Sequence, residues 1–189
     1  MSSLVLHPTD VAQWHALVNE AQAACNCNLD ESLESYLVFL LMRFAERPEI
    51  ARRIMALEFM EAQFKARQQI DQLRDVGDQC LLFSGLFPQI ARKRMVRISY
   101  FVAIGRTAYG QLASLADRQG ERLYSRLAEA FVGVMDVLQA MRGLSGETVL
   151  EPLAAAELWE DTGSRAALAS LGSTSQRALP VTCRSRWKN

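Results

Sequence analysis

The sequence lacks an excess of charge of either sign, because its 189 residues include 21 Lys and Arg side chains and 21 Asp and Glu side chains. A neutral chain has no overall field that would attract it to nucleic acid or to an anionic membrane. Long hydrophobic runs are also missing: the longest, YLVFLLM at residues 36–42, is far shorter than the roughly 20 residues that span a bilayer. The first residues, MSSLVLHPTD, have neither the basic start nor the apolar core of a signal peptide. We therefore expect a cytoplasmic protein that does not enter membranes and for which nucleic acid is a disfavoured partner.

Histidine is scarce, and only His7 and His15 are present. Together with Cys25 and Cys27, His15 would form an incomplete zinc site, so free thiols are the favoured interpretation of the cysteines. Four cysteines in a chain of this length also do not suggest the disulfide framework of a small secreted protein. No phosphate-binding loop, dinucleotide fingerprint, nucleophile elbow, zinc-protease motif or calcium loop is present. We expect no cofactor and no metal. The lack of these motifs favours a protein that is not an enzyme.

The composition favours helices over strands. Leu, Ala, Arg, Gln and Glu dominate, half of the residues are hydrophobic, and there are only five prolines and ten glycines. No segment alternates apolar and polar residues with hairpin turns between. We predict an all-α, single-domain helical bundle of about seven helices over residues 1–171, followed by an irregular basic tail at 172–189.

Apolar residues that recur every three or four positions predict the helix ranges. Asp10 and Asp30 are candidate caps for the first two helices, Ser99 for a later one, and Gly163 marks a break in the last. The helix from residue 66 either begins there or continues its predecessor. The expected helices cover residues 10–26, 31–47, 48–64, 66–83, 99–116, 120–142 and 148–171, with a short helix or turn at 89–97.

Residues 77–109 combine helix breakers, apolar residues and a basic cluster, and any functional site is expected in this segment. The cluster follows Pro88 and precedes a helix start, where free backbone N–H groups and guanidinium forks can bind phosphates or carboxylates. A solubilising loop is the alternative interpretation. The candidate anion- or partner-binding residues are Arg92, Lys93, Arg94, Arg97 and Arg106.

The helix expected at 99–116 carries both aromatic bulk and small residues. Small side chains allow a neighbouring helix or a flat ligand to approach, and tyrosines suit interfaces and pockets. Packing between helices is the favoured interpretation, and a ligand pocket is the alternative. The candidate pocket residues are Asp78, Phe83, Ser84, Phe87, Tyr100 and Tyr109.

The same segment resembles one shared by a family of uncharacterised, all-helical bacterial proteins. The resemblance covers about a sixth of the chain and implies a bacterial protein and a region of interest, but no activity. It is carried by GDQCLLFSGLFP and SYFVAIGRTAY, through Gly77, Asp78, Leu81, Ser84, Gly85, Phe87, Pro88, Tyr100, Phe101, Gly105, Ala108 and Tyr109.

These observations lead to one expected function and two alternatives. The expected function is a non-enzymatic, cytoplasmic, helical binding or regulatory protein that engages an acidic protein or an anionic small ligand through residues 77–109. Abundant apolar residues over 31–64 predict a homodimer, since a surplus apolar face commonly becomes an interface. The first alternative is a small-molecule sensor or enzyme with an aromatic pocket around the helix at 99–116. The second is a regulator that binds nucleic acid.

Overall fold

A computed structural model describes residues 8–46, 66–146 and 150–177, and these residues form helices and connecting turns without any strand, which confirms the all-α class. The helix expected at 48–64 lies outside the described residues. Within them there are nine helices rather than the expected seven or so. They are α1 (Pro8–Cys25), α2 (Glu31–Glu46), α4 (Ala66–Gly85), α5 (Gln89–Lys93), α6 (Ile98–Leu115), α7 (Arg118–Glu129), α8 (Phe131–Leu144), α9 (Pro152–Thr162) and α10 (Arg165–Arg177).

Several helices begin and end where the sequence predicts. Before α2, the Asp30 carboxylate accepts hydrogen bonds from the backbone N–H groups of Ser32 and Leu33, at 3.0 and 3.3 Å, and so caps the helix. At the end of α9, Gly163 has a φ of +72°, a left-handed conformation that glycine adopts without strain. The expected break between α9 and α10 is therefore confirmed.

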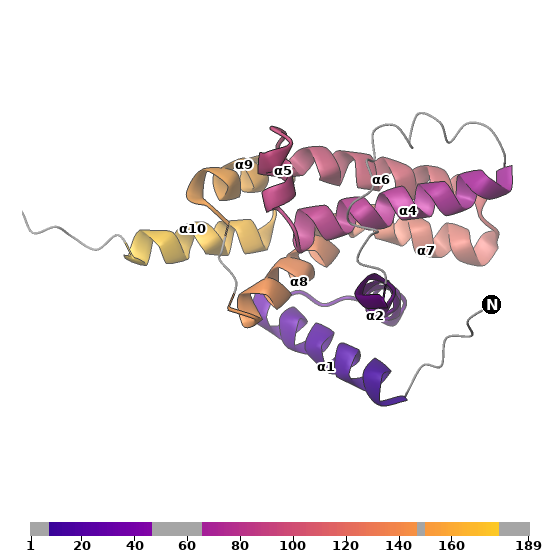
Figure 1. Cartoon of the computed structure of the whole chain (residues 1–189), viewed down its shortest axis with the longest axis horizontal. Helices are drawn as coiled ribbons and strands as arrows, with labels where there is room; N and C mark the ends of the chain where they lie inside the picture. Colours follow the sequence, from indigo (N-terminus) through magenta and orange to yellow (C-terminus); the bar gives the residue numbers. More distant parts are fainter. Residues whose placement is uncertain (1–7, 47–65, 147–149, 178–189) are drawn as a thin grey trace, which may run out of the picture.

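The helices do not form a simple up-and-down bundle. Figure 1 shows α4, α6 and α7 side by side along the long axis, whereas α2 is seen end-on and α1 crosses below them. The short pair of α9 and α10 covers one end of the molecule. The prediction of a bundle is therefore wrong in its arrangement, because helices at several crossing angles surround one core.

The single helix expected at 120–142 is two helices, α7 and α8, which separate at Ala130. One face of α7 is charged and exposed, whereas α8 is buried on most sides. A straight continuation could not satisfy both environments, so the chain turns inward at Ala130. The Arg106 side chain donates from Nε to the backbone carbonyl of Ala128 at 3.0 Å, which satisfies one of the free carbonyls at the end of α7.

Three helix ends also differ from the prediction. The residue at the N-cap of α6 is Arg97 rather than Ser99, whose hydroxyl instead donates to Asp161. The helix α9 begins at Pro152 rather than at residue 148. The helix α10 continues to Arg177, so residues 172–177, expected in the irregular tail, are helical. Residues 178–189 of that tail lie outside the described residues.

Close contact between α4, α6 and α8 organises the core. A Cβ atom added to Gly77 of α4 would lie 2.5 Å from Tyr109 Cε1 of α6, and one added to Gly105 of α6 would overlap the ring of Phe131. These glycines therefore let large aromatic side chains of the next helix fill the core. None of the described helices is both long and apolar enough to cross a membrane.

Candidate functional site

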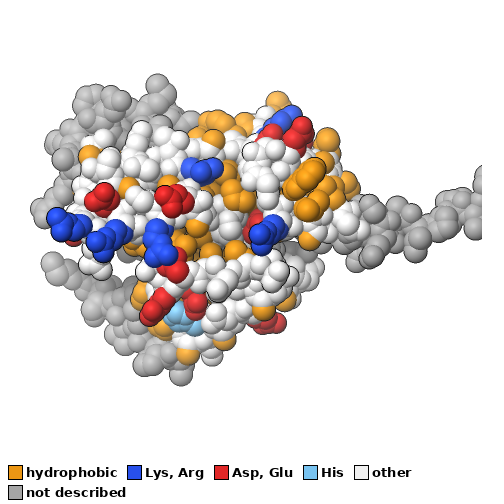
Figure 2. All heavy atoms as spheres, turned by 180° about the vertical axis from the view of Figure 1, so that it is seen from behind, with side chains coloured by type: hydrophobic (Ala, Val, Ile, Leu, Met, Phe, Trp, Pro, Cys, Tyr) orange, Lys and Arg blue, Asp and Glu red, His pale blue; other side chains and the backbone are white. Residues whose placement is uncertain are grey.

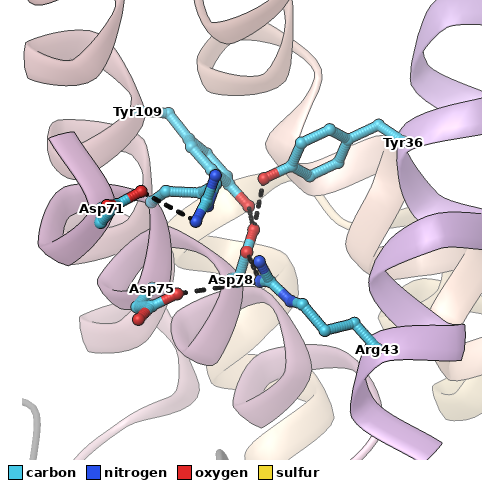
Figure 3. A network of polar contacts seen from close by, with 7 residues as sticks. Tyr36, Arg43, Asp71, Asp75, Asp78 and Tyr109 are labelled. Carbon is cyan, nitrogen blue, oxygen red and sulfur yellow. Dashed lines mark hydrogen bonds and ion pairs between the residues drawn. The ribbon is translucent and has the colours of Figure 1, made fainter. Parts of the chain in front are cut away.

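A buried carboxylate joins α2, α4 and α6. The Asp78 side chain of α4 is only 1 % exposed, and one of its oxygens accepts hydrogen bonds from the hydroxyls of Tyr36 and Tyr109, at 2.5 and 2.7 Å. Its other oxygen accepts from Nη2 of Arg43. Figure 3 shows the three donors converging on the carboxylate from two different helices. Below, the Asp78 cluster means Tyr36, Arg43, Asp78 and Tyr109.

Burial controls the electrostatics of this cluster. Burial raises the pKa of Asp78, although the Arg43 guanidinium and the two tyrosine hydroxyls each favour the ionised form. Burial, followed by the neighbouring Asp78 carboxylate, also raises the pKa of both tyrosines well above their ordinary value. The hydroxyls therefore stay protonated near neutral pH and act as hydrogen-bond donors.

Aromatic rings enclose the Asp78 cluster. The ring of Tyr109 stacks on Tyr124 with centroids 6.3 Å apart, and it lies 6.2 Å from the ring of Tyr36 in an edge-to-face arrangement. The Phe131 ring packs on Tyr109 from the side of α8, at 6.0 Å. These rings and the tight contact at Gly77 surround Asp78 closely, and the hydrogen bonds of the cluster fasten α2, α4 and α6 together.

The remaining candidate pocket residues do not surround a common cavity. Phe83 is fully buried against Phe101, with ring centroids 5.4 Å apart, and Phe87 packs on Phe44 at the same separation. Tyr100 lies at the surface. Ser84 is buried, and its hydroxyl donates to the Cys80 carbonyl of its own helix at 2.8 Å. Of the six residues, only Asp78 and Tyr109 are joined by a hydrogen bond.

The basic cluster lies beside acidic side chains of α9 and of the residue that precedes it. Arg92 forms an ion pair with Glu151. Arg97 lies 3.5 Å from Glu157 and 3.4 Å from Asp161, and a hydrogen bond from Ser99, followed by Arg97 itself, lowers the pKa of Asp161. On the face drawn in Figure 2, acidic side chains likewise lie near the basic ones.

The other basic candidates point to different surroundings. The Arg94 guanidinium lies over the ring of Phe83, 5.8 Å from its centroid, a cation–π arrangement. Lys93 is exposed at the end of α5. Arg106 contacts the end of α7, so the structure does not bring it to Arg92 and Arg97.

A groove between the α5–α6 corner and α9 is a feature that the sequence indicated only in part. It has a volume of about 590 Å³, and we refer to it as the α5–α9 groove. Most of its wall is apolar, and three arginines and two glutamates lie on its lining. The lining residues are Pro88, Gln89, Ala91, Arg92, Val96, Arg97, Ile98, Arg142, Gly146, Leu150, Glu151, Leu153, Ala154 and Glu157.

Half of the groove comes from residues 88–98, where the sequence did point to a site. The other half comes from the end of α8 and from α9, more than 40 residues later in the chain. The only local signal for this second half was the spacing of Glu151 and Glu157, which lie three or four residues from apolar positions of α9. The same spacing is typical of an ordinary amphipathic helix.

His15 and Cys27, two of the candidate zinc ligands, lie in different surroundings. His15 Nδ1 lies 2.9 Å from a carboxylate oxygen of Glu34, whereas the Cys27 thiol contacts the Gly133 carbonyl of α8. In the part of the chain that the structure describes, no group of three or more His, Cys, Asp or Glu residues is arranged to hold a metal ion.

Comparisons of the chain with protein-family models, with curated proteins and with solved structures give no match.

Proposed function

We propose that this chain is a binding protein that holds an anionic small ligand in the α5–α9 groove. The observation that carries the proposal is an apolar cavity of about 590 Å³ with arginines on its lining. Ligand sites commonly have volumes of about 300–1,000 Å³, mostly apolar walls and a few polar groups that fix the orientation. The groove has this composition, and the Asp78 cluster does not.

An incoming anion can replace the acidic partner of Arg92 at low cost. The side chains of Arg92 and Glu151 are 77 % and 64 % exposed, and an ion pair as exposed as this contributes only about 0–1 kcal/mol. A carboxylate or phosphate that also places apolar atoms in the groove would compete well with Glu151 for the guanidinium, which binds such groups through two parallel hydrogen bonds.

The lining supports binding rather than nucleophilic catalysis. Among the described residues, the polar side chains on the lining are Arg, Glu and Gln, and they offer charged anchors rather than a nucleophile with an adjacent base. The pairing of Arg92 and Arg97 with acids also disfavours a nucleic-acid surface, which needs uncompensated positive charge along the phosphate backbone.

Fluorescence titration with 8-anilinonaphthalene-1-sulfonate, an apolar aromatic anion, tests the proposal. We expect saturable binding of one molecule per chain, weakened about tenfold in a variant that combines Arg92→Gln with Arg97→Gln. Arg118→Gln is the matched control, because Arg118 is an exposed arginine of α7 that does not line the groove. An equal effect of the control variant, or no saturable binding, would overturn the proposal.

Native mass spectrometry of the purified protein gives a second test. A mass above that of the denatured chain, lost in the Arg92→Gln and Arg97→Gln variant, would identify a ligand that co-purifies in the groove. An acidic protein bound in place of a small molecule would appear in the same spectrum as a much larger complex, and that result would contradict the small-ligand proposal.

A further inference from the structure

A second cavity lies next to the α5–α9 groove. It has a volume of about 260 Å³, and we refer to it as the α8–α10 cavity. It lies where the ends of α1 and α8 meet beside α10 (Figure 1). Its hollow results from small side chains on these three helices. The lining residues are Ala24, Cys25, Gln139, Ala140, Arg142, Gly143, Leu144, Leu150, Ala166, Ala169 and Ser170.

The two cavities share a wall. Arg142 and Leu150 line both of them. Leu150 is partly buried and packs against the hydrophobic core, and the carbon stem of an arginine is as apolar as a leucine side chain. The Leu150 side chain and the carbon stem of Arg142 therefore offer apolar surface to a hydrocarbon chain that extends from the groove toward the cavity.

The polar groups of the α8–α10 cavity are already satisfied by the protein. The Gln139 amide donates to the Ser84 carbonyl at 3.0 Å, and the Ser170 hydroxyl donates to the Ala166 carbonyl at 2.9 Å. Burial raises the pKa of the Cys25 thiol to about 11, so this sulfur is uncharged near neutral pH. The cavity offers no polar group that needs a ligand, and its occupant is expected to be apolar.

We propose that the α5–α9 groove and the α8–α10 cavity form one tract for a single-chain anionic amphiphile, such as a fatty acid. The anionic head binds Arg92 and Arg97, and the hydrocarbon tail passes Leu150 and ends among the small residues of the cavity. This inference rests on the proposed function, since it assumes that the groove binds an anion. At roughly 30 Å³ for each heavy atom, the volume of a water molecule in the liquid, the cavity of about 260 Å³ adds space for a further eight or nine atoms.

The length of the tail is the variable to test. Octanoate has a short tail that the proposed tract keeps within the groove, whereas tetradecanoate has six more methylene groups, which the proposed tract places past Leu150 and in the cavity. Each buried methylene group strengthens binding about fourfold, so we expect tetradecanoate to displace 8-anilinonaphthalene-1-sulfonate at concentrations at least a hundredfold lower than octanoate. Both carboxylates are used as monomers, below the concentrations at which they form micelles.

Filling the cavity should affect only the long chain. Ala24→Leu places a larger side chain on the cavity wall, and Ala23→Leu makes the same change at the neighbouring exposed position of α1, which does not line the cavity. We expect Ala24→Leu to weaken tetradecanoate at least tenfold and to leave octanoate unchanged. Ala169→Leu, on α10, should reproduce this effect, and Ala23→Leu should affect neither carboxylate.

The Cys25 thiol provides a direct readout of where the tail ends. In a background of Cys27→Ser and Cys183→Ser, alkylation of Cys25 by N-ethylmaleimide is followed by mass spectrometry. Cys80 is fully buried and should not react under folding conditions. We expect tetradecanoate to slow the alkylation of Cys25 several-fold and octanoate to leave it unchanged.

The outcomes separate this inference from the proposed function. If octanoate and tetradecanoate bind equally, both sensitive to Arg92→Gln and Arg97→Gln, the continuous tract is wrong and the proposed function stands. If neither carboxylate nor the fluorescent probe binds, both proposals are wrong. Binding only to vesicles of anionic phospholipid, without displacement by monomeric carboxylates, would also overturn the tract, because it would indicate a membrane surface as the ligand.

Discussion

Asp78 illustrates, at the scale of single residues, how a motif that resembles an active site can serve structure. A buried carboxylate with two tyrosines and an arginine could be a catalytic group if substrate reached it. Its 1 % exposure and the aromatic rings around it favour a structural role instead. The hydrogen bonds of Asp78 then contribute to the stability of the fold, because each lost partner leaves a buried charge less well satisfied.

Removing one hydroxyl from the Asp78 cluster should therefore destabilise the fold. A hydrogen bond to a charged group contributes about 1.5–3 kcal/mol, and we expect Tyr109→Phe to lower the free energy of unfolding by about that amount. Chemical denaturation followed by circular dichroism measures the change. Tyr100→Phe removes the hydroxyl of an exposed tyrosine of the same helix and should change the stability by less than about 0.5 kcal/mol. Equal effects of the two variants would contradict a stabilising role for the cluster.

The raised pKa of Asp78 predicts how its contribution to stability changes with pH. In the unfolded chain the carboxyl ionises near 3.8, whereas burial makes it ionise at higher pH in the folded protein. Ionisation then costs the folded state more than the unfolded state. We expect the stability of the wild type, relative to Asp78→Asn, to be highest at acidic pH, to fall as pH rises through the raised pKa, and to be constant above it.

Denaturation of both proteins at a series of pH values from about 3.5 to 7.5 measures this difference, and titrations common to both proteins cancel. A relative stability that increases with pH would mean that Arg43 and the tyrosine hydroxyls lower the pKa of Asp78 by more than burial raises it.

Sequence reasoning identified only part of the Asp78 cluster. It placed Asp78 and Tyr109 in one segment and considered that they could be close, and the structure joins them. It missed Tyr36 and Arg43, which precede Asp78 by 42 and 35 residues. No local pattern marks those two, because Tyr36 has the spacing of an ordinary core residue and Arg43 that of a basic residue near a helix end.

At the scale of helices, the glycines of the 77–109 segment are explained by the close approach of α4, α6 and α8. The expectation that small residues there allow a helix to come near agrees with the overlap that a Cβ at Gly77 or Gly105 would cause. Not every glycine of α6 has this role: a Cβ added to Gly110 meets no atom of the described residues within 4 Å. One helix thus offers a buried glycine and an exposed glycine for comparison.

Alanine substitution should have opposite effects at these two glycines. Gly105→Ala forces a methyl group against Phe131 and the Cβ of Cys80, and overpacking of this kind costs about 1–3 kcal/mol. Gly110→Ala should instead stabilise the protein by about 0.5–1 kcal/mol, because alanine favours a helix interior and open space surrounds it. Thermal unfolding measures both, and destabilisation by Gly110→Ala would show that this side of α6 is packed against a neighbour instead of facing open space.

The boundary between α7 and α8 is a helix end that the sequence did not predict. Residues 120–142 keep an unbroken helical spacing of apolar side chains, and Ala130, at the turn, is itself a strong helix former. The turn depends on where each half lies in the tertiary structure, exposed for α7 and buried for α8. A change from charged to apolar composition within one periodic segment was the available signal.

At the scale of the whole molecule, the zero net charge of the chain corresponds to ion pairs that the fold forms between distant segments. The acids that pair with Arg92 and Arg97 come from Glu151 and from α9, more than 50 residues later. The local cluster at 92–97 therefore suggested more positive charge than the folded surface presents. The α5–α9 groove has the same origin, since two distant segments form its walls, and this is why the sequence indicated one half of it and not the other.

The whole molecule also allows the predicted homodimer to be tested. On α2 the apolar residues are mostly core, with Phe39 exposed, so that helix has little surplus apolar surface. The rest of the segment from which the homodimer was predicted, residues 47–64, lies outside the described residues. Large exposed hydrophobic side chains occur elsewhere. Leu153, Trp159 and Leu168 on α9 and α10 are 73 %, 46 % and 49 % exposed, and Met95, between α5 and α6, is 88 % exposed. Figure 2 shows hydrophobic side chains gathered at this end of the molecule.

We therefore expect the dimer interface to include the exposed faces of α9 and α10. Sedimentation velocity should give twice the 21.2 kDa mass of one chain for the wild type at micromolar concentration. Trp159→Glu should give the monomer, because a stable interface buries about 1,200–2,000 Å² and does not tolerate an unpaired charge among its central apolar residues. Gln119→Glu, which adds the same charge at an exposed position of α7, should leave the dimer intact. A wild type that sediments as a monomer would contradict the homodimer, and a dimer that persists in Trp159→Glu would place its interface elsewhere.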